Sequence, residues 1–318
     1  MKQLYTYGIY LKKKFKTKVS KLPMGISGFT CPNIDGTVAK GGCTFCENDS
    51  FSPNLASNAG KTFLNLESTS NPILEQQLQD VDRQLKSSRA YISTNYGSKK
   101  FLAYFQAFTN TYAPFETLKM LYDRALSHDD VIGLSIGTRS DSITEETLAY
   151  LVELSKDHEV WLEYGIQSVY DETLDKINRG HDAKNVKEAI LRAKELGLNV
   201  CGHLIFGLPG ETQEMMLESA KQSYEWGIDS VKYHPLYVVK NTLLANQYRQ
   251  GKFTPINKEE YIDTLIKAIK MKPDHISIQR VTAGIDDDTL LAPAWCGSGR
   301  NQMMNYISKA MAKEGWRY

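Results

Sequence analysis

Runs of apolar and β-branched residues recur along the chain, and each run is long enough to form a strand. Six of them predict strands at residues 101–106, 131–137, 160–167, 199–210, 230–239 and 275–281. A seventh run, at residues 22–29, predicts one more strand ahead of these six.

The stretches between these runs carry apolar residues at helical spacing. The spacing predicts helices at roughly 72–92, 114–127, 144–156, 171–179, 183–196, 212–226 and 258–271, and a last one at about 301–314. Thr144 and Thr212, each followed by an early glutamate, are suited to cap the start of a helix. Gly197 and Gly227 lie where helices are expected to end.

Strands that alternate with helices indicate parallel βαβ units. We therefore expect an α/β fold, a partial (β/α)6 TIM-like barrel of parallel strands with N- and C-terminal extensions, although spacing alone does not separate it from an open doubly wound sheet. The predicted division is a basic N-terminal arm (1–21), the barrel domain (22–285) and a C-terminal extension packed on the barrel (286–318). In both architectures, chemistry is expected at the carboxyl ends of the strands.

Composition narrows the class of protein. Of 318 residues, 42% are hydrophobic and 24% are charged, which is typical of a globular chain. No apolar run approaches a membrane span, and the N-terminus lacks the pattern of a secretory signal, so we expect a cytoplasmic protein. The net charge of +1 hides an asymmetry, because residues 1–34 hold seven lysines and no acid. Such an arm suits a polyanion such as RNA, but it is equally typical of a solvated edge.

The five cysteines are an odd count for a disulfide framework. Cys31, Cys43 and Cys46 have the spacing C-x11-C-x2-C within a loop at residues 30–60 that lacks periodicity. A structural zinc site requires four ligands, whereas a [4Fe–4S] cluster held by three cysteines keeps one iron open. S-adenosylmethionine (SAM) can chelate such an iron through its amino and carboxylate groups. Zinc with a distant fourth ligand and unmetallated thiols remain the alternatives.

The sequence resembles the radical SAM superfamily in several long stretches that occur in the family's order. They are TCPNIDGTVAKGGCTFC, FQAFTNTYAP, IGTRSD, EYGIQSVYDETLDKINRGH, HLIFGLPGET and KYHPLYVVKNT, and they cover about residues 22–285. Within the superfamily the chain resembles the branch of the Elongator catalytic subunit, and more closely the YhcC/YtqA (MnmL-type) group. The resemblance implies a [4Fe–4S] cluster on the three cysteines, SAM as cofactor, and hydrogen abstraction by a 5′-deoxyadenosyl radical.

The same resemblance implies further contacts to SAM. Gln106 lies at the strand edge that holds the amino group, and Glu163 contacts the ribose with Gln167 beside it. Arg179 pairs with the carboxylate, for which a guanidinium fork is suited. The alternatives are a strand-end turn for Gln106, a buried structural hydrogen bond or an exposed strand edge for Glu163, and a helix-terminal cation for Arg179.

Three further candidate residues follow from the sequence itself. Arg139 lies in a polar cluster after a predicted strand, where it would bind a ribose or carboxylate unless the cluster only caps a helix. Ile205 and Leu208 flank a Gly/Pro turn whose backbone can approach an adenine closely. An ordinary βα turn would explain the same residues.

The strand residue Lys232 must find a partner, because an unpaired buried ammonium is costly. That partner is a substrate carboxylate or a core acid such as Glu163. Arg280 belongs to the same class, and both are candidates for the catalytic site. Asn110 and His234 are candidates for substrate contact, and the arm lysines are candidates for RNA contact, namely Lys12, Lys13, Lys14 and Lys16.

The resemblance points to tRNA as the substrate, with conversion of 5-carboxymethylaminomethyl uridine to 5-aminomethyl uridine at the wobble position. Expected partners are tRNA, a reductase such as flavodoxin or ferredoxin, and a downstream tRNA methyltransferase. The alternatives are a radical SAM enzyme acting on another RNA position or a small metabolite, and a non-catalytic zinc-bearing RNA-binding module.

Overall fold

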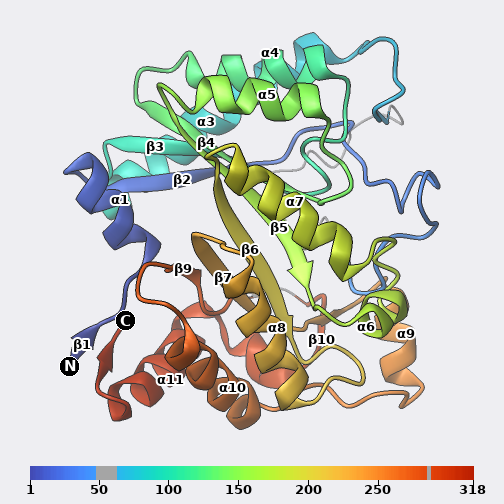
Figure 1. Ribbon diagram of the computed structural model, residues 1–318, viewed down its shortest axis with the longest axis vertical. Coiled ribbons are helices and arrows are strands. Elements are labelled where there is room, and N and C mark those ends of the chain that lie inside the picture. Colours follow the sequence, from blue (N-terminus) through green and yellow to red (C-terminus); the bar gives the residue numbers. More distant parts are fainter. Residues whose placement is uncertain (48–62, 285–287) are drawn as a thin grey trace.

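The computed structural model describes residues 1–47, 63–284 and 288–318. Its centre is one sheet of parallel strands, in the order β2-β3-β4-β5-β6-β7-β9, curled into a half-barrel (Figure 1). The strands are β2 (Val19–Met24), β3 (Lys100–Phe105), β4 (Val131–Thr138), β5 (Glu159–Gln167), β6 (Asn199–Phe206), β7 (Ser230–Pro235) and β9 (Ser277–Arg280). The predicted α/β partial barrel is confirmed, and each of the seven apolar runs overlaps a strand.

The first strand differs from its prediction, since it spans Val19–Met24 rather than 22–29. It ends because the next residue, Gly25, bonds a side chain instead of the sheet. The amide of Gln84 accepts from Gly25 N (2.9 Å) and donates to Gly25 O (2.9 Å).

Helices cover the outer face of the half-barrel (Figure 1). They are α3 (Leu74–Tyr96), α4 (Phe115–Leu126), α5 (Glu145–Leu154), α6 (Asp171–Lys176), α7 (Ala183–Glu195), α8 (Gln213–Glu225) and α10 (Lys258–Met271). The predicted caps are confirmed. Thr144 accepts from Thr147 N and Thr212 accepts from Met215 N, while Gly197 and Gly227 follow their helices with φ of 80° and 89°.

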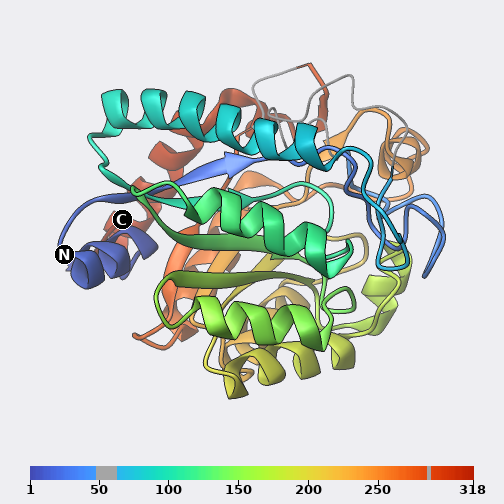
Figure 2. The same cartoon turned by 90° about the horizontal axis from the view of Figure 1, so that it is seen from above.

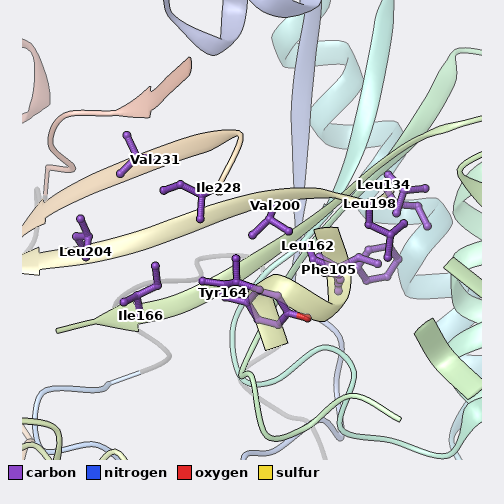
Figure 3. Packing of buried hydrophobic residues seen from close by; sticks show 14 of the residues in the cluster. Phe105, Leu134, Leu162, Tyr164, Ile166, Leu198, Val200, Leu204, Ile228 and Val231 are labelled. Atoms are coloured by element: carbon purple, nitrogen blue, oxygen red, sulfur yellow. The ribbon is translucent and has the colours of Figure 1, made fainter. Parts of the chain in front are cut away.

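The main hydrophobic core lies between the outer face of the sheet and these helices (Figure 3). Alternate residues of β5 enter it, namely Leu162, Tyr164 and Ile166, each fully buried. Because side chains alternate along a strand, the intervening Trp161 and Glu163 face the interior of the half-barrel.

A helix that the sequence analysis did not predict closes the amino-terminal end of the half-barrel. This helix, α1 (Tyr7–Phe15), packs Tyr7 and Leu11 against Trp161 and Cys201 inside the strands. The main chain before it bonds the last strand, since Ile278 N donates to Tyr5 O (3.0 Å). The lysines that suggested an arm lie on its exposed side, and they obscured the short apolar stripe that defines the helix.

The remaining elements follow β7 or lie at the two termini. They are β8 (Val238–Val239), α9 (Leu243–Arg249), β10 (Leu290–Ala292), the 3-10 helix η1 (Ala294–Ser298), α11 (Arg300–Lys313), and the strands β1 (Lys2–Gln3) and β11 (Trp316–Arg317). Helix α11 confirms the predicted last helix and buries Ile307 and Met311 in the main core. The predicted boundary at 285/286 falls outside the described residues, so the division into domains stays a prediction. Among the described helices, none is long and apolar enough to span a membrane.

Candidate functional site

The loop after β2 carries the three cysteines, and its C-x2-C turn is fixed from two sides. Within the turn, Cys46 N donates to Cys43 O (3.0 Å). Between them, Thr44 N donates to Ile177 O after α6 (3.0 Å), and Thr44 O accepts from Leu244 N of α9 (2.8 Å). Elements far apart in sequence therefore hold this turn in place. Residues 48–60 of the predicted loop lie outside the described part of the chain.

The sulfur atoms receive hydrogen-bond donors. Thr109 Oγ1 donates to Cys31 Sγ (3.0 Å), Asn33 Nδ2 donates to Cys43 Sγ (3.3 Å), and Arg179 Nη1 lies 3.6 Å from Cys43 Sγ. Burial raises the pKa of the Cys31 thiol to about 11, although the hydrogen bond from Thr109 acts in the opposite direction and lowers it. Donors aimed at sulfur stabilise thiolates that ligate a metal centre.

The three loop sulfurs do not form the compact group that a single zinc ion requires. Zn–S bonds of about 2.3 Å place the sulfurs of a tetrahedral site about 3.8 Å apart. Within residues 1–47, 63–284 and 288–318, the one group whose metal-binding atoms all lie within 4.8 Å of one another is Glu163, Cys201 and His203. The loop cysteines are not such a group, so their sulfurs are spread more widely than zinc requires.

Polar groups without partners lie around the cysteine loop. Arg139 clamps Asp141 with two hydrogen bonds (2.8 and 2.6 Å), yet its Nη1 has no partner within the described chain. Arg179 donates to Gly165 O (2.9 Å) and leaves its Nε unsatisfied, as Gln167 leaves its Oε1. A side chain at Gly165 would meet both Arg179 and Gln167 at 2.7 Å. This site therefore offers buried donors and one acceptor to a further polar group.

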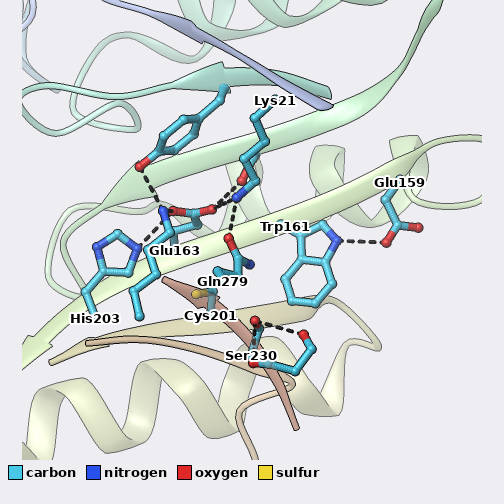
Figure 4. A network of polar contacts seen from close by, with 12 residues as sticks. Lys21, Glu159, Trp161, Glu163, Cys201, His203, Ser230 and Gln279 are labelled. Atoms are coloured by element: carbon cyan, nitrogen blue, oxygen red, sulfur yellow. Dashed lines mark hydrogen bonds and ion pairs between the residues drawn. The ribbon is translucent and has the colours of Figure 1, made fainter. Parts of the chain in front are cut away.

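Below the loop, a network of charged side chains crosses the interior of the half-barrel, with Glu163 at its centre (Figure 4). The Glu163 carboxylate is fully buried and pairs with the ammonium groups of Lys21 and Lys232. Ser135 Oγ donates to it (2.5 Å), and His203 Nε2 lies 2.9 Å from it. Burial alone would raise the pKa of Glu163, but the two ammonium groups hold it well below its ordinary range.

This network excludes a metal ion at Glu163, Cys201 and His203. The ammonium group of Lys21 occupies one carboxylate oxygen and that of Lys232 occupies the other. Two cations in contact with the carboxylate oppose a third. The donor atoms are close enough for a metal, but the charges around them are not suitable.

A pocket opens beside Cys46 at the carboxyl ends of β6, β7 and β9. Its volume is about 150 Å³, and it is lined by Phe45, Cys46, Gln167, His203, Leu204, Ile205, Lys232, His234, Pro235, Leu236, Tyr237 and Arg280. One wall is apolar, and the other carries basic side chains. No carboxylate lines it in the described chain, so the pocket is suited to an anionic group.

Comparison with known proteins identifies the family. The sequence profile of the Radical SAM superfamily matches residues 36–222, and that of the Radical_SAM C-terminal domain matches residues 228–313. The chain belongs to the radical SAM superfamily. The match to the first profile begins just after Cys31 and includes Cys43 and Cys46.

Relatives of this radical SAM protein confirm the predicted branch. It is 37% identical to protein YhcC of Escherichia coli (strain K12) over 291 residues, which are 91% of this chain and 86% of YhcC. It is 28% identical to a tRNA uridine(34) acetyltransferase of Methanocaldococcus infernus over 189 residues, 58% of this chain and 34% of that protein. The fold is similar to that of the archaeal Methanocaldococcus infernus Elp3, with a TM-score of 0.64 and 20% identity over 94% of this chain and 64% of that one.

Membership of the radical SAM superfamily implies a [4Fe–4S] cluster and SAM. The described residues fit this pair of groups. Cys31, Cys43 and Cys46 would hold the cluster, and the unsatisfied atoms of Arg139, Arg179 and Gln167 lie where a polar cofactor needs donors and an acceptor. The cofactor roles of the individual residues stay predictions.

The structure brings several predicted residues of the radical SAM site together. Gln167, Ile205, Lys232, His234 and Arg280 line the pocket beside Cys46. Leu208 packs with Ile205 in the apolar cluster under the pocket. The ion pair between Lys232 and Glu163, one of the two alternatives for Lys232, is present.

Other predicted residues lie apart from the pocket. Gln106 follows β3 directly, and its backbone N donates to Met24 O (3.0 Å), while Asn110 is buried with its amide on Ala107 O and Gly137 O. The lysines proposed for RNA contact, Lys12, Lys13, Lys14 and Lys16, are on or just after α1, at the opposite end of the half-barrel. Of these, Lys14 pairs with Glu159 (2.5 Å).

Sequence reasoning missed four residues that the structure places in contact with the site. Lys21 and His203 bind Glu163, and Asn33 and Thr109 donate to the cysteine sulfurs. Lys21 had a signal, since it alternates with buried residues in a strand as Lys232 does. Asn33 and Thr109 had none, because loop residues carry no periodicity.

The half-buried histidine His203 makes stability depend on pH. Burial, followed by the charge of Lys232, lowers the pKa of His203 to about 4. Unfolding restores the ordinary value near 6.5, so the stabilisation is complete above about pH 6.5 and is lost as the pH falls through 4. Between about pH 7 and pH 4 the free energy of unfolding of the wild type falls. We expect this fall to be about 2–3 kcal/mol smaller in His203→Gln. Urea titrations across this range test it, with exposed His275→Gln as control. An unaltered pH dependence in His203→Gln would contradict the assignment.

Proposed function

We propose that this radical SAM protein acts on the wobble uridine of tRNA. In this proposal it converts 5-carboxymethylaminomethyl uridine to 5-aminomethyl uridine by removing the carboxymethyl group. The similarity to a tRNA uridine(34) acetyltransferase over 58% of the chain supports the choice of tRNA. The basic pocket beside Cys46 supports a substrate group that ends in a carboxylate.

The observation that carries the proposal is the unpaired guanidinium of Arg280. Lys232, the other cation that sequence analysis proposed, is committed to Glu163 and to Tyr104 OH (3.0 Å). Within the described chain, no hydrogen bond or ion pair engages the side chain of the half-buried Arg280, although it lines the pocket. A planar guanidinium with free N–H groups binds a carboxylate through two hydrogen bonds. Arg280 therefore anchors the carboxylate of the substrate, and Lys232 contributes charge behind it.

The histidines of the pocket are neutral near pH 7. Burial lowers the pKa of His234 to about 3, as it lowers that of His203 to about 4. His234 Nδ1 lies 2.6 Å from Pro235 O, a carbonyl that only accepts, so Nδ1 carries the proton and Nε2 is free to accept a hydrogen bond. A pKa so low makes His234 a poor base near pH 7, so its neutral Nε2 is suited to orient the attacking water while the proton of that water passes to solvent.

When bound, the [4Fe–4S] cluster and SAM would supply the removal of one hydrogen atom and one electron from the methylene next to the carboxylate. The substrate becomes an iminium. Water adds to its carbon, and the C–N bond breaks with its electron pair and a proton going to nitrogen. The products are 5-aminomethyl uridine and a two-carbon aldehyde acid. A reductase such as flavodoxin or ferredoxin would supply electrons, a tRNA methyltransferase could act on the amine, and we place the activity in the cytoplasm.

The test is a nucleoside profile of tRNA by mass spectrometry from cells that lack the protein. We expect 5-carboxymethylaminomethyl uridines to accumulate and the aminomethyl and methylaminomethyl forms to disappear. Wild-type protein and the exposed-residue control Arg83→Gln should restore the profile, whereas Arg280→Gln should leave most of the precursor unconverted. An unchanged profile in the deletion strain would refute tRNA as the substrate, and full restoration by Arg280→Gln would refute the carboxylate anchor.

A further inference from the structure

A second acid-free stretch, apart from the N-terminal one, lies close to the pocket. Residues 230–258 contain five lysines and arginines and no aspartate or glutamate. They form β7, β8, α9 and the turns after them. Three of the cations are enclosed or paired, since Lys232 binds Glu163, Lys240 binds Asp288 (2.9 Å) and Lys258 binds Glu259 (3.4 Å). The exposed part of this charge lies on α9 and the turn that follows it.

Helix α9 has one buried and one exposed side. Its buried side, Leu244 and Ala245, belongs to the apolar cluster that also contains Ile205 and Leu236 of the pocket wall. Its outer side forms a shallow depression, which we call the α9 face, lined by Leu243, Asn246, Gln247, Arg249, Gln250 and Lys252. The α9 face therefore combines two cations, three primary amides and one exposed leucine, with no carboxylate.

Helix α9, which carries this face, borders the cysteine loop. Leu244 N at the start of α9 donates to Thr44 O, between Cys43 and Cys46 (2.8 Å). Helix α1, which carries the lysines first proposed for RNA contact, is at the other end of the strands, as Figures 1 and 2 both show. The nine residues of β5 alone span about 30 Å. A nucleotide in the pocket would have its neighbours at α9 and not at α1.

We propose that the α9 face binds the phosphodiester backbone of the substrate RNA beside the nucleotide in the pocket, an inference that rests on the proposed function. Arg249 and Lys252 have no carboxylate partner within the described chain, so both are available to phosphates. The side chains of Asn246, Gln247 and Gln250 can bond phosphate oxygens or base edges, and Leu243 offers an apolar surface to a base. An acidic protein partner would complement the two cations. It would not explain why three primary amides lie beside them at the edge of a nucleotide pocket.

The experiment measures the affinity of the cluster-containing protein for unmodified tRNA at several salt concentrations. The test variant is Arg249→Gln with Lys252→Gln. The matched comparison is Lys12→Gln with Lys13→Gln on α1, which removes the same charge at the other end. Lys309→Gln with Lys313→Gln on α11 controls for net charge alone. We expect the α9 variant to bind about tenfold more weakly at low salt and to lower the salt slope by about 1.5–2, while both other pairs stay near wild type.

Each outcome is decisive. Weakening that is confined to the α9 variant supports the proposal. A larger loss in the α1 pair, equal losses in all three pairs, or no loss in the α9 variant overturns it while tRNA binding by the wild type stands. An α9 variant that binds tRNA normally but is reduced more slowly by flavodoxin would assign the surface to the reductase and also overturn it. If the wild-type protein binds no tRNA, the proposed function itself fails.

Discussion

We expect Glu163→Gln to destabilise the fold by about 3–5 kcal/mol near pH 7. The substitution preserves size and some hydrogen bonds, but it leaves Lys21 and Lys232 facing each other without an anion. Burial already lowers the pKa of each lysine, so both ammonium groups are costly without Glu163. Because the lysines can lose their protons, the deficit should shrink as the pH rises toward about 10. Urea unfolding at neutral and alkaline pH measures both effects.

Two further variants test whether the effect is specific to the buried charges. Glu145→Gln removes one partner of an exposed ion pair with Arg192 (2.8 Å), and we expect little change. Adding Lys21→Met to Glu163→Gln removes one uncompensated cation and should restore part of the stability. If Glu163→Gln unfolds at the wild-type urea concentration, the charged network does not stabilise the half-barrel as its geometry indicates.

The order of strands and helices could be predicted because the buried face of each element repeats apolar residues with the period of a strand or a helix. The apolar runs at 160–167 and 199–210 became β5 and β6, and the caps at Thr144 and Thr212 formed as expected. Helix α1 was missed because its apolar stripe is short and because lysines dominate its end. Lys12, Lys13 and Lys14 lie in its last turn, and Lys16 follows it. Helix α9 was missed because its position follows from packing on the cysteine loop, which local sequence does not encode.

The site was only partly predictable, for a related reason. Cysteine spacing and the family resemblance locate Cys31, Cys43 and Cys46. These ligands of one metal centre lie close together in the sequence, so their spacing can be recognised as a motif. The interior charges do not, because Lys21 and Glu163 are 142 positions apart and meet only when the sheet curls. Glu163 and Lys232 each needed a partner on physical grounds, and the partner could be the cofactor, the substrate or the other residue. Only the register of the strands decides that they pair with each other.

The cysteines give the prediction with the largest effect on activity. We expect Cys31→Ser, Cys43→Ser and Cys46→Ser each to lose the cluster iron and sulfide, the brown colour and all SAM cleavage. Each of these sulfurs is one of only three thiolates that the loop offers to the cluster, and a hydroxyl is a poor replacement for a soft sulfur ligand. Anaerobic reconstitution followed by iron and sulfide analysis measures the loss without depending on the tRNA substrate.

The other two cysteines are matched controls, because both are fully buried outside the cysteine loop. Cys201 packs with Trp161 and Leu102, and Cys296 packs with Tyr237 and Met303. We expect Cys201→Ser and Cys296→Ser to keep the iron and sulfide of the wild type, since neither sulfur faces the loop. Stoichiometric zinc in place of iron in the anaerobically purified wild type would contradict the cluster assignment. Loss of iron in Cys201→Ser would instead show that the group of Glu163, Cys201 and His203 holds metal despite the two lysines.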